Sequence, residues 1–243
     1  HGRRGEFRAA LVGYTNAGKS SVLRAMSGSP DVFVEDRLFA TLDPLSREVE
    51  LGEGQRMVLI DTVGFIRKLP HHLVASFRAT LEELNEADLL LHVIDASHPS
   101  WEEQREVVDD VVADLGAREK PMLYVFNKRD RLPDDEAEGL GTRVAHLFPE
   151  SVMVSSVTPG GLDPLRQALR DHVRRYKPLL ELRLGHGEGK LLAELHRSGE
   201  VVEQRHTDDG LYVRVRLDAA ALGRALRAGA TVVDTDAAVS ASR

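Results

Sequence analysis

Near the start of the chain stands Gly13-Tyr14-Thr15-Asn16-Ala17-Gly18-Lys19-Ser20, which fits the pattern G-x-x-x-x-G-K-[ST] of a phosphate-binding loop. An apolar run precedes it and a helical pattern follows it, as this motif requires. Its glycines let successive backbone N–H groups point at a polyphosphate, and the helix beginning near Lys19 adds the positive end of its dipole. Lys19 can reach the outer phosphates, and the Ser20 hydroxyl can ligate Mg²⁺. The alternative is a glycine-containing turn with an exposed lysine, but the flanking strand and helix favour the phosphate loop.

Composition describes an ordinary soluble protein of 243 residues, with 42% hydrophobic and 29% charged residues. No apolar run approaches about 18 residues, so we expect no membrane span. No signal region opens the chain, which indicates a cytoplasmic protein, and the absence of an initiator Met suggests a fragment. Zero cysteines exclude disulfides and thiolate metal sites. A net charge of −7 argues against a DNA-coating protein, although it leaves room for docking to an RNA–protein particle.

Strand and helix patterns alternate along the first part of the chain, which predicts an α/β fold: a P-loop NTPase domain with a mostly parallel sheet. Ligands of such sheets bind at the carboxyl ends of the strands. The stretch 32–44 is too irregular for either element and is expected to be a loop. Strands are expected at 7–12, 45–51, 57–60, 89–94, 122–126 and 151–154, and helices at 19–27, 69–85, 101–115, 134–147 and 162–176.

A boundary is expected at Lys177-Pro178, because the residue before proline is pushed out of the helical region. This divides the chain into a nucleotide-binding domain, 1–177, and a small C-terminal domain, 178–243. The latter shows the order βαββα(β), with a hairpin turn at 208–210, and predicts a two-layer, ferredoxin-like α+β domain. Its basic and acidic residues nearly balance, so it is not a basic nucleic-acid module.

Two further segments can act on the phosphates. Asp61-Thr62-Val63-Gly64 follows a strand, so Asp61 can hold Mg²⁺ through water and the Gly64 N–H can sense a γ-phosphate. Thr41 lies in a loop long enough to fold over the phosphates; its hydroxyl can complete the Mg²⁺ shell and its carbonyl can orient an attacking water. Alone, the first segment would be a strand-end turn and Thr41 an inert loop residue.

The segment Asn127-Lys128-Arg129-Asp130 gives the preference for a base. The Asp130 carboxylate can accept hydrogen bonds from N1–H and the 2-amino group of guanine, which adenine lacks, and unpaired buried polar groups reject the wrong base. Asn127 can tie this loop to the phosphate loop, and the stem of Lys128 can cover the base. Ser155-Ser156-Val157 can supply a backbone N–H to the guanine O6. The motifs together predict a guanine-nucleotide site.

Phe65 follows Gly64, where a Ras-like switch carries a glutamine that orients water. Phenylalanine cannot do this, so we expect slow intrinsic hydrolysis that waits for a partner or an ion. Asn16 is a candidate ligand for a monovalent cation such as K⁺.

Several runs resemble the HflX family of translational GTPases: GYTNAGKS (13–20), VEDRLFATLDP (34–44), DTVGFIR (61–67) and FRATLEELNEADLLLHVIDA (77–96). The resemblance covers about 7–176 and implies a ribosome-associated GTPase that binds the large (50S) subunit and splits stalled or idle ribosomes under stress. It implies a monomer that binds GTP or GDP with Mg²⁺ on Ser20 and Thr41, and no DNA. The catalytic groups are expected to be Lys19, Thr41 and Gly64. The nucleotide contacts are expected at Gly13, Tyr14, Thr15, Asn16, Ala17, Gly18, Lys19, Ser20, Ser21, Phe39, Ala40, Thr41, Leu42, Asp43, Asp61, Thr62, Val63, Gly64, Asn127, Lys128, Arg129, Asp130, Ser155, Ser156 and Val157.

The chain departs from the family in two ways. The long N-terminal domain of the family, which enters the ribosome, is expected to be missing, so ribosome splitting is not expected of this chain alone. Ser156 replaces the usual alanine and Pro159 the usual glycine, with little expected effect, because a backbone group contacts the base. Two alternatives stay open: a nucleotide-gated binding module with negligible hydrolysis, and a P-loop kinase or ATPase, against which Asp130 argues.

Overall fold

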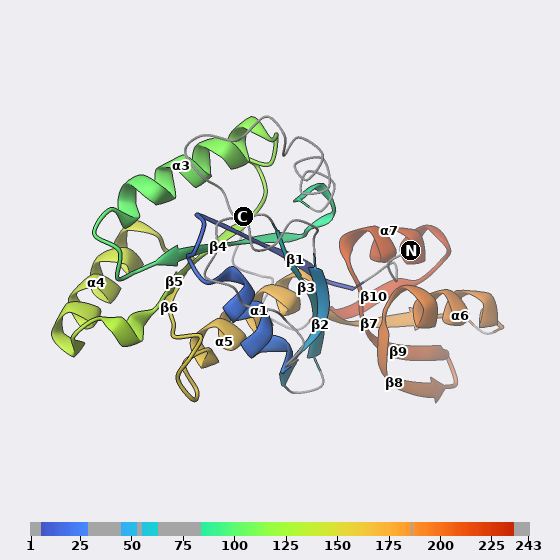
Figure 1. Ribbon diagram of the computed structural model, residues 1–243. Helices are drawn as coiled ribbons and strands as arrows, with labels where there is room; N and C mark the ends of the chain where they lie inside the picture. The colour runs from blue at the N-terminus through green and yellow to red at the C-terminus, as the bar shows by residue number, and fades with distance from the viewer. Residues whose placement is uncertain (1–5, 29–44, 53–54, 63–83, 186, 236–243) are drawn as a thin grey trace. The chain divides into compact units, whose positions relative to one another are not determined.

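The computed structural model describes residues 6–28, 45–52, 55–62, 84–185 and 187–235 (Figure 1). The chain divides into two compact units, Phe7–Leu169 and a second that contains Arg170–Arg243. The predicted boundary at 177/178 stays a prediction. Among the helices that the structure describes, none is both long and apolar enough to cross a lipid bilayer.

The first unit is built on a six-stranded sheet with the strand order β2-β3-β1-β4-β5-β6. Strands β3, β1, β4, β5 and β6 pair in parallel, while β2 pairs antiparallel to β3 at the edge. Parallel pairing follows from the helical connections, because a helix returns the chain to the same end of the sheet. The strands are β1 (Arg8–Gly13), β2 (Leu45–Gly52), β3 (Gln55–Asp61), β4 (Leu89–Asp95), β5 (Met122–Asn127) and β6 (Ser151–Met153).

Helices cover both faces of this sheet, which explains why its central strands are continuous apolar runs. Figure 1 shows α1 and α5 on one face and α3 on the other. Val108 and Val112 of α3 pack against β1 and β4, while Trp101 of α3 and Val144 of α4 share a cluster with Phe126 of β5. The helices are α1 (Lys19–Ser27), α3 (Trp101–Asp114), α4 (Asp134–Leu147) and α5 (Asp163–Tyr176).

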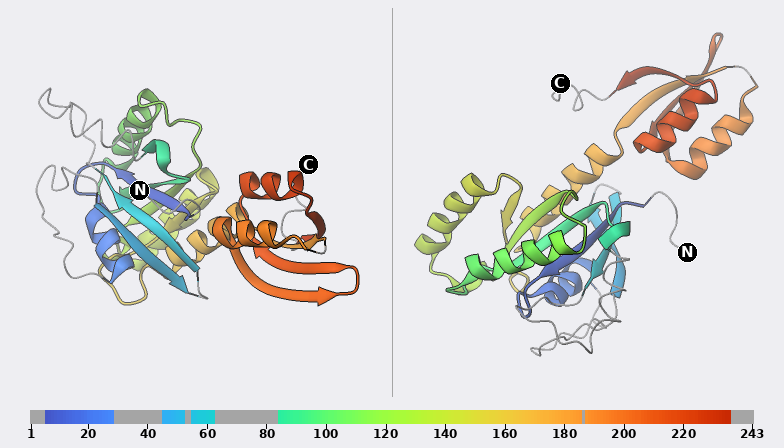
Figure 2. Two further views of the ribbon diagram at one scale, coloured as in Figure 1. Left: turned by 90° about the vertical axis from the view of Figure 1, so that its right-hand side faces the viewer. Right: turned by 90° about the horizontal axis from the view of Figure 1, so that it is seen from above.

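The second unit is an antiparallel sheet of four strands in the order β10-β7-β9-β8, with two helices on one face (Figure 2). Alternate residues of β7 and β9, among them Leu182 and Val213, are fully buried and pack with Leu195 of α6 and Ala225 of α7. The elements are β7 (Leu179–Leu184), α6 (Gly189–Ser198), β8 (Glu200–Thr207), β9 (Gly210–Arg216), α7 (Ala219–Arg227) and β10 (Thr231–Thr235). This order and topology are those of a ferredoxin-like α+β domain.

The predicted fold class is therefore confirmed in both units. Each expected element within the described residues is present, with ends that differ by a few residues. The expected helix at 69–85 and the loop at 32–44 lie almost entirely outside the described residues.

Candidate functional site

The predicted site gathers at one edge of the first sheet, where β1, β3, β4 and β5 end. Leu11 pairs with Asp61 across β1 and β3, and Asp95 pairs with Asn127 across β4 and β5. Because these strands are parallel and adjacent, the loops that leave them meet at this edge. Three predicted segments are thus neighbours: the phosphate loop (13–20), Asp61-Thr62 at the end of β3, and the base-recognition segment 127–130.

The phosphate loop runs from the end of β1 into the first turn of α1. Gly18 has φ +101°, and a Cβ at this position would lie only 2.3 Å from Nδ2 of Asn127, so the loop accepts only glycine there. Lys19 is buried, and its Nζ donates to the carbonyl oxygens of Gly13 (3.3 Å) and Tyr14 (3.4 Å). Burial lowers the pKa of Lys19, and the nearby charge of Asp61 opposes this shift. The Lys19 ammonium is thus held inside the loop, where a phosphate would sit.

Ser20 and Asp61 lie in direct contact at the head of α1. The Ser20 hydroxyl donates to Oδ2 of Asp61 at 2.5 Å, and Asp61 is 1% exposed. Thr62 donates its hydroxyl to the carbonyl of Leu11 at 2.6 Å, which fixes the chain as it leaves β3. Two hard oxygens side by side are a donor set that suits Mg²⁺. In the described part of the chain no three acidic or histidine side chains gather as a metal site.

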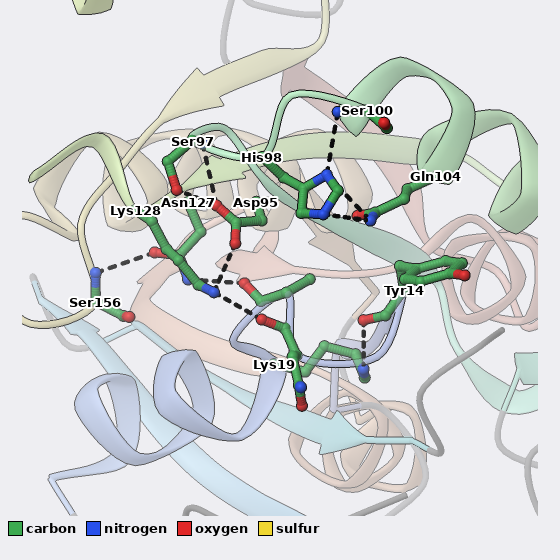
Figure 3. A network of polar contacts seen from close by, with 12 residues as sticks. Tyr14, Lys19, Asp95, Ser97, His98, Ser100, Gln104, Asn127, Lys128 and Ser156 are labelled. Atoms are coloured by element: carbon green, nitrogen blue, oxygen red, sulfur yellow. Dashed lines mark hydrogen bonds and ion pairs between the residues drawn. The ribbon is translucent and has the colours of Figure 1, made fainter. Parts of the chain in front are cut away.

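Asn127 joins three loops of the site (Figure 3). This fully buried side chain donates from Nδ2 to the carbonyl of Ala17 at 3.1 Å and accepts the N–H of Ser156 at Oδ1, also at 3.1 Å. The side-chain amide of Asn127 therefore ties two segments to β5: the phosphate loop and the turn at 155–157, called the serine turn below. The sequence predicted the first of these contacts.

Asp130 lies on a 3₁₀ turn, η2 (Arg129–Arg131), with its side chain exposed. Its Oδ1 accepts the hydroxyl of Ser155 at 2.5 Å. Ser155 Oγ in turn accepts the backbone N–H groups of Val157 (3.4 Å) and Thr158 (3.3 Å). The Asp130 carboxylate and the serine turn are thus held in direct contact with one another.

Lys128 bridges two segments. Its backbone is left-handed, with φ +65°, and its Nζ donates to the carbonyl of Asn16 and to Oδ2 of Asp95, both at 2.7 Å. Asn16 is also left-handed, with φ +62°, and its residue surface is exposed. Sequence reasoning assigned no role to Asp95, although its place at the end of a buried strand beside Asn127 was a usable signal.

The other predicted residues divide into two groups. Tyr14, Thr15 and Ser21 are half-buried on the phosphate loop and α1, and Arg129 forms an ion pair with Asp134 at 3.8 Å. The predicted contacts that lie outside the described residues are Phe39, Ala40, Thr41, Leu42, Asp43, Val63 and Gly64.

Comparison with known proteins places this site among GTPases. Residues 8–128 match the family model described as "50S ribosome-binding GTPase". A protein named "GTPase HflX" from Magnetococcus marinus is 45% identical over 218 residues, which are 90% of this chain and 49% of that protein. A protein of the same name from Gluconacetobacter diazotrophicus is 44% identical over 225 residues, 93% of this chain and 49% of that protein. The chain thus spans about half the length of the curated relatives that it matches.

Solved structures show the same fold. A point variant of Aquifex aeolicus Era bound to GDP·AlF4⁻ superposes with a TM-score of 0.56 at 23% identity, covering 68% of this chain and 56% of that one. The complex of a GTP-binding protein designated SsGBP with GDP gives a TM-score of 0.54 at 25% identity, covering 70% of this chain and 51% of that one.

Proposed function

The chain belongs to the HflX family of GTPases, and from this premise we propose that it binds GTP and GDP and hydrolyses GTP as a molecular switch. One observation carries the proposal. Asn127, the first residue of the base-recognition segment 127–130, contacts Ala17 of the phosphate loop and Ser156 of the serine turn. This contact supports the proposal because it joins the loop proposed to hold the polyphosphate to the segment that carries Asp130, the carboxylate proposed to select guanine. Both ends of a guanine nucleotide then have partners.

Each residue has a defined part in this switch. Lys19 exchanges its contacts with loop carbonyls for phosphate oxygens, and its charge stabilises the γ-phosphate as negative charge develops. Ser20 and Asp61 would hold Mg²⁺, which when bound neutralises phosphate charge. Asp130, oriented by Ser155, accepts from N1–H and the 2-amino group of guanine. Thr41 and the Gly64 N–H are proposed to contact the γ-phosphate side and to position water.

We propose that hydrolysis by the isolated chain is slow. Phe65 has no polar group with which to orient water, so a partner or a monovalent cation on Asn16 supplies the missing element. The partner that we propose is the large ribosomal subunit, in line with the description of the matching family model. A cytoplasmic location follows from that partner.

Single-turnover hydrolysis of GTP tests this function, with and without purified large ribosomal subunits and in K⁺ or Na⁺ buffer. We expect slow hydrolysis alone, faster hydrolysis with the subunits, and more in K⁺ than in Na⁺. Lys19→Ala is the matched control and should lose both nucleotide binding and turnover. Nucleotide binding with no hydrolysis in any condition would instead favour a nucleotide-gated binding module, which the presence of Phe65 keeps as the second candidate.

Co-sedimentation with large subunits tests the partner. We expect more of the chain in the pellet with a non-hydrolysable GTP analogue than with GDP. Equal sedimentation with the GTP analogue and with GDP would show that the nucleotide does not control binding to the subunit, and would contradict the proposed switch.

A further inference from the structure

We propose that Asp95 is a positioning residue of the nucleotide site, which holds Lys128 against the phosphate loop and thereby slows release of the nucleotide. The inference rests on the proposed function, since it assumes that guanine nucleotide binds at this edge of the sheet. It concerns a residue to which the sequence analysis assigned no role, although Asp95 lies within the family-like run 77–96.

The contact geometry points to this role. Lys128 Nζ lies 2.7 Å from Oδ2 of Asp95 and 2.7 Å from the carbonyl oxygen of Asn16, so one ammonium joins the end of β4 to the phosphate loop. Figure 3 shows the two side chains directed toward one another beside Asn127. The side chains of Asp95 and Lys128 are 13% and 18% exposed, so solvent screens this ion pair less than it would a pair on the surface.

Asp95 is itself held in place. Its Oδ1 accepts the N–H (3.1 Å) and the hydroxyl (2.6 Å) of Ser97, and the N–H of Ala96 donates to the carbonyl of Asn127 at 2.9 Å. Burial raises the pKa of Asp95, but the hydrogen bonds from Lys128 and Ser97 outweigh burial and leave the pKa below its ordinary value. The carboxylate is thus a fixed, ionised acceptor and not a mobile surface group.

A fixed acceptor matters because of what Lys128 must do. A lysine side chain has four rotatable bonds and loses considerable entropy when it is ordered. With Asp95 present, Lys128 is ordered before the nucleotide arrives, and its aliphatic stem is available to cover the base as the sequence predicts. Its ammonium also fixes the carbonyl of Asn16, and with it the left-handed turn of the phosphate loop. Loss of the carboxylate should therefore loosen both ends of the site together.

The test measures release of a fluorescent GDP analogue from the full chain by stopped flow. We expect Asp95→Asn, which keeps the shape but not the charge, to release the nucleotide about tenfold faster, or about 1.4 kcal/mol. Ser97→Ala keeps the charge and removes one hydrogen bond to the same carboxylate, so its effect should be smaller. Asp110→Asn makes the same charge change on the exposed face of α3 and should release at the wild-type rate.

A double-mutant cycle separates positioning from a general structural effect. If Asp95 acts through Lys128, the double variant Asp95→Asn/Lys128→Met should release no faster than Lys128→Met alone. Independent, additive effects would overturn the inference, as would a wild-type rate in both Asp95→Asn and Ser97→Ala. A wild-type chain that does not bind the GDP analogue would overturn the proposed function itself, a distinguishable result. Should Asp95→Asn fail to fold, Ser97→Ala and Lys128→Met together still decide the matter.

Discussion

Replacing Gly161 with alanine should weaken guanine recognition, although Gly161 is not itself among the predicted nucleotide contacts. Gly161 closes the serine turn: its carbonyl accepts the N–H of Ser155 at 3.0 Å, and its own N–H donates to the carbonyl of Thr158 at 3.0 Å. A Cβ here would lie 2.3 Å from the carbonyl oxygen of Ser155 and 2.4 Å from Oγ1 of Thr158, well inside the 3.0 Å that real Cβ atoms keep. The backbone of Ser155 must therefore move.

The size of the effect follows from the hydrogen bonds that this movement breaks. Moving Ser155 away lengthens its backbone bond to Gly161 and its 2.5 Å hydroxyl bond to Asp130. Each hydrogen bond contributes about 0.5–1.5 kcal/mol, so two give about 1–3 kcal/mol. To bind guanine as the wild type does, the variant must bring the displaced turn back into place, so we expect a comparable loss of binding free energy and GDP binding weaker by roughly 5- to 150-fold.

Competition between a fluorescent GDP analogue and unlabelled GDP or IDP reads out this loss. IDP lacks the 2-amino group that Asp130 is proposed to accept, so Gly161→Ala should reduce the preference for GDP over IDP, not merely the affinity for both. Gly139→Ala is the matched control, because the same methyl group on α4 meets no atom within 4 Å. Binding of GDP within about twofold of wild type by a folded Gly161→Ala chain would refute the coupling of this loop to the base.

Two further predictions concern the base and the core. Asp130→Asn should move the preference from GDP toward xanthosine diphosphate, because an amide donates where xanthine offers a carbonyl; unchanged GDP affinity would refute the assignment of this residue. His92, 1% exposed on β4 and 3.1 Å from Oδ1 of Asp109, should make the fold sensitive to acid. Burial lowers the pKa of His92 from 6.5, and its contacts with Asp109 oppose the shift without reversing it. The unfolded chain therefore takes up the proton first, so this stability is present above pH 6.5 and is lost as the pH falls. Urea unfolding at pH 8 and pH 5.5 should show a smaller loss for His92→Asn than for wild type, and equal losses would contradict this origin.

The sequence was sufficient for the fold because its signals were local and mutually consistent. The run Leu89–Ile94, apolar apart from His92, predicted a strand buried on both faces, and Asp208-Asp209-Gly210 predicted a tight turn between strands. The buried side chains of β9 recur at every second residue, and those of α7 recur at helical spacing, as one buried face of a strand or a helix requires. Such patterns depend on neighbours in the chain and need no knowledge of distant contacts.

The parts of the site that escaped prediction depend on contacts between distant residues. Asp95 and Lys128 are 33 positions apart, and nothing near either residue announces the pair. Gly161 reads as one of two glycines in a loop until the carbonyl of Ser155 is found against it. The parallel-sheet rule did place Asp95 beside Asn127, so that residue could have been nominated but not assigned a partner.

These long-range contacts explain how the phosphate end and the base end of the site can work as one unit. Asn127 holds Ala17 of the phosphate loop, Lys128 holds Asn16 next to it, and Ser155 holds Asp130. All of these bonds join one protein group to another, so the frame supplies its own order and little ordering cost falls on the nucleotide when it binds. A GTPase switch also needs such a frame. Its switch segments change conformation between the GTP and GDP states, and the rest of the site must keep its structure for that change to depend on the γ-phosphate. A variant that loosens the frame should therefore weaken binding of GTP and GDP equally, whereas a variant in the loops proposed to contact the γ-phosphate should weaken binding of GTP alone.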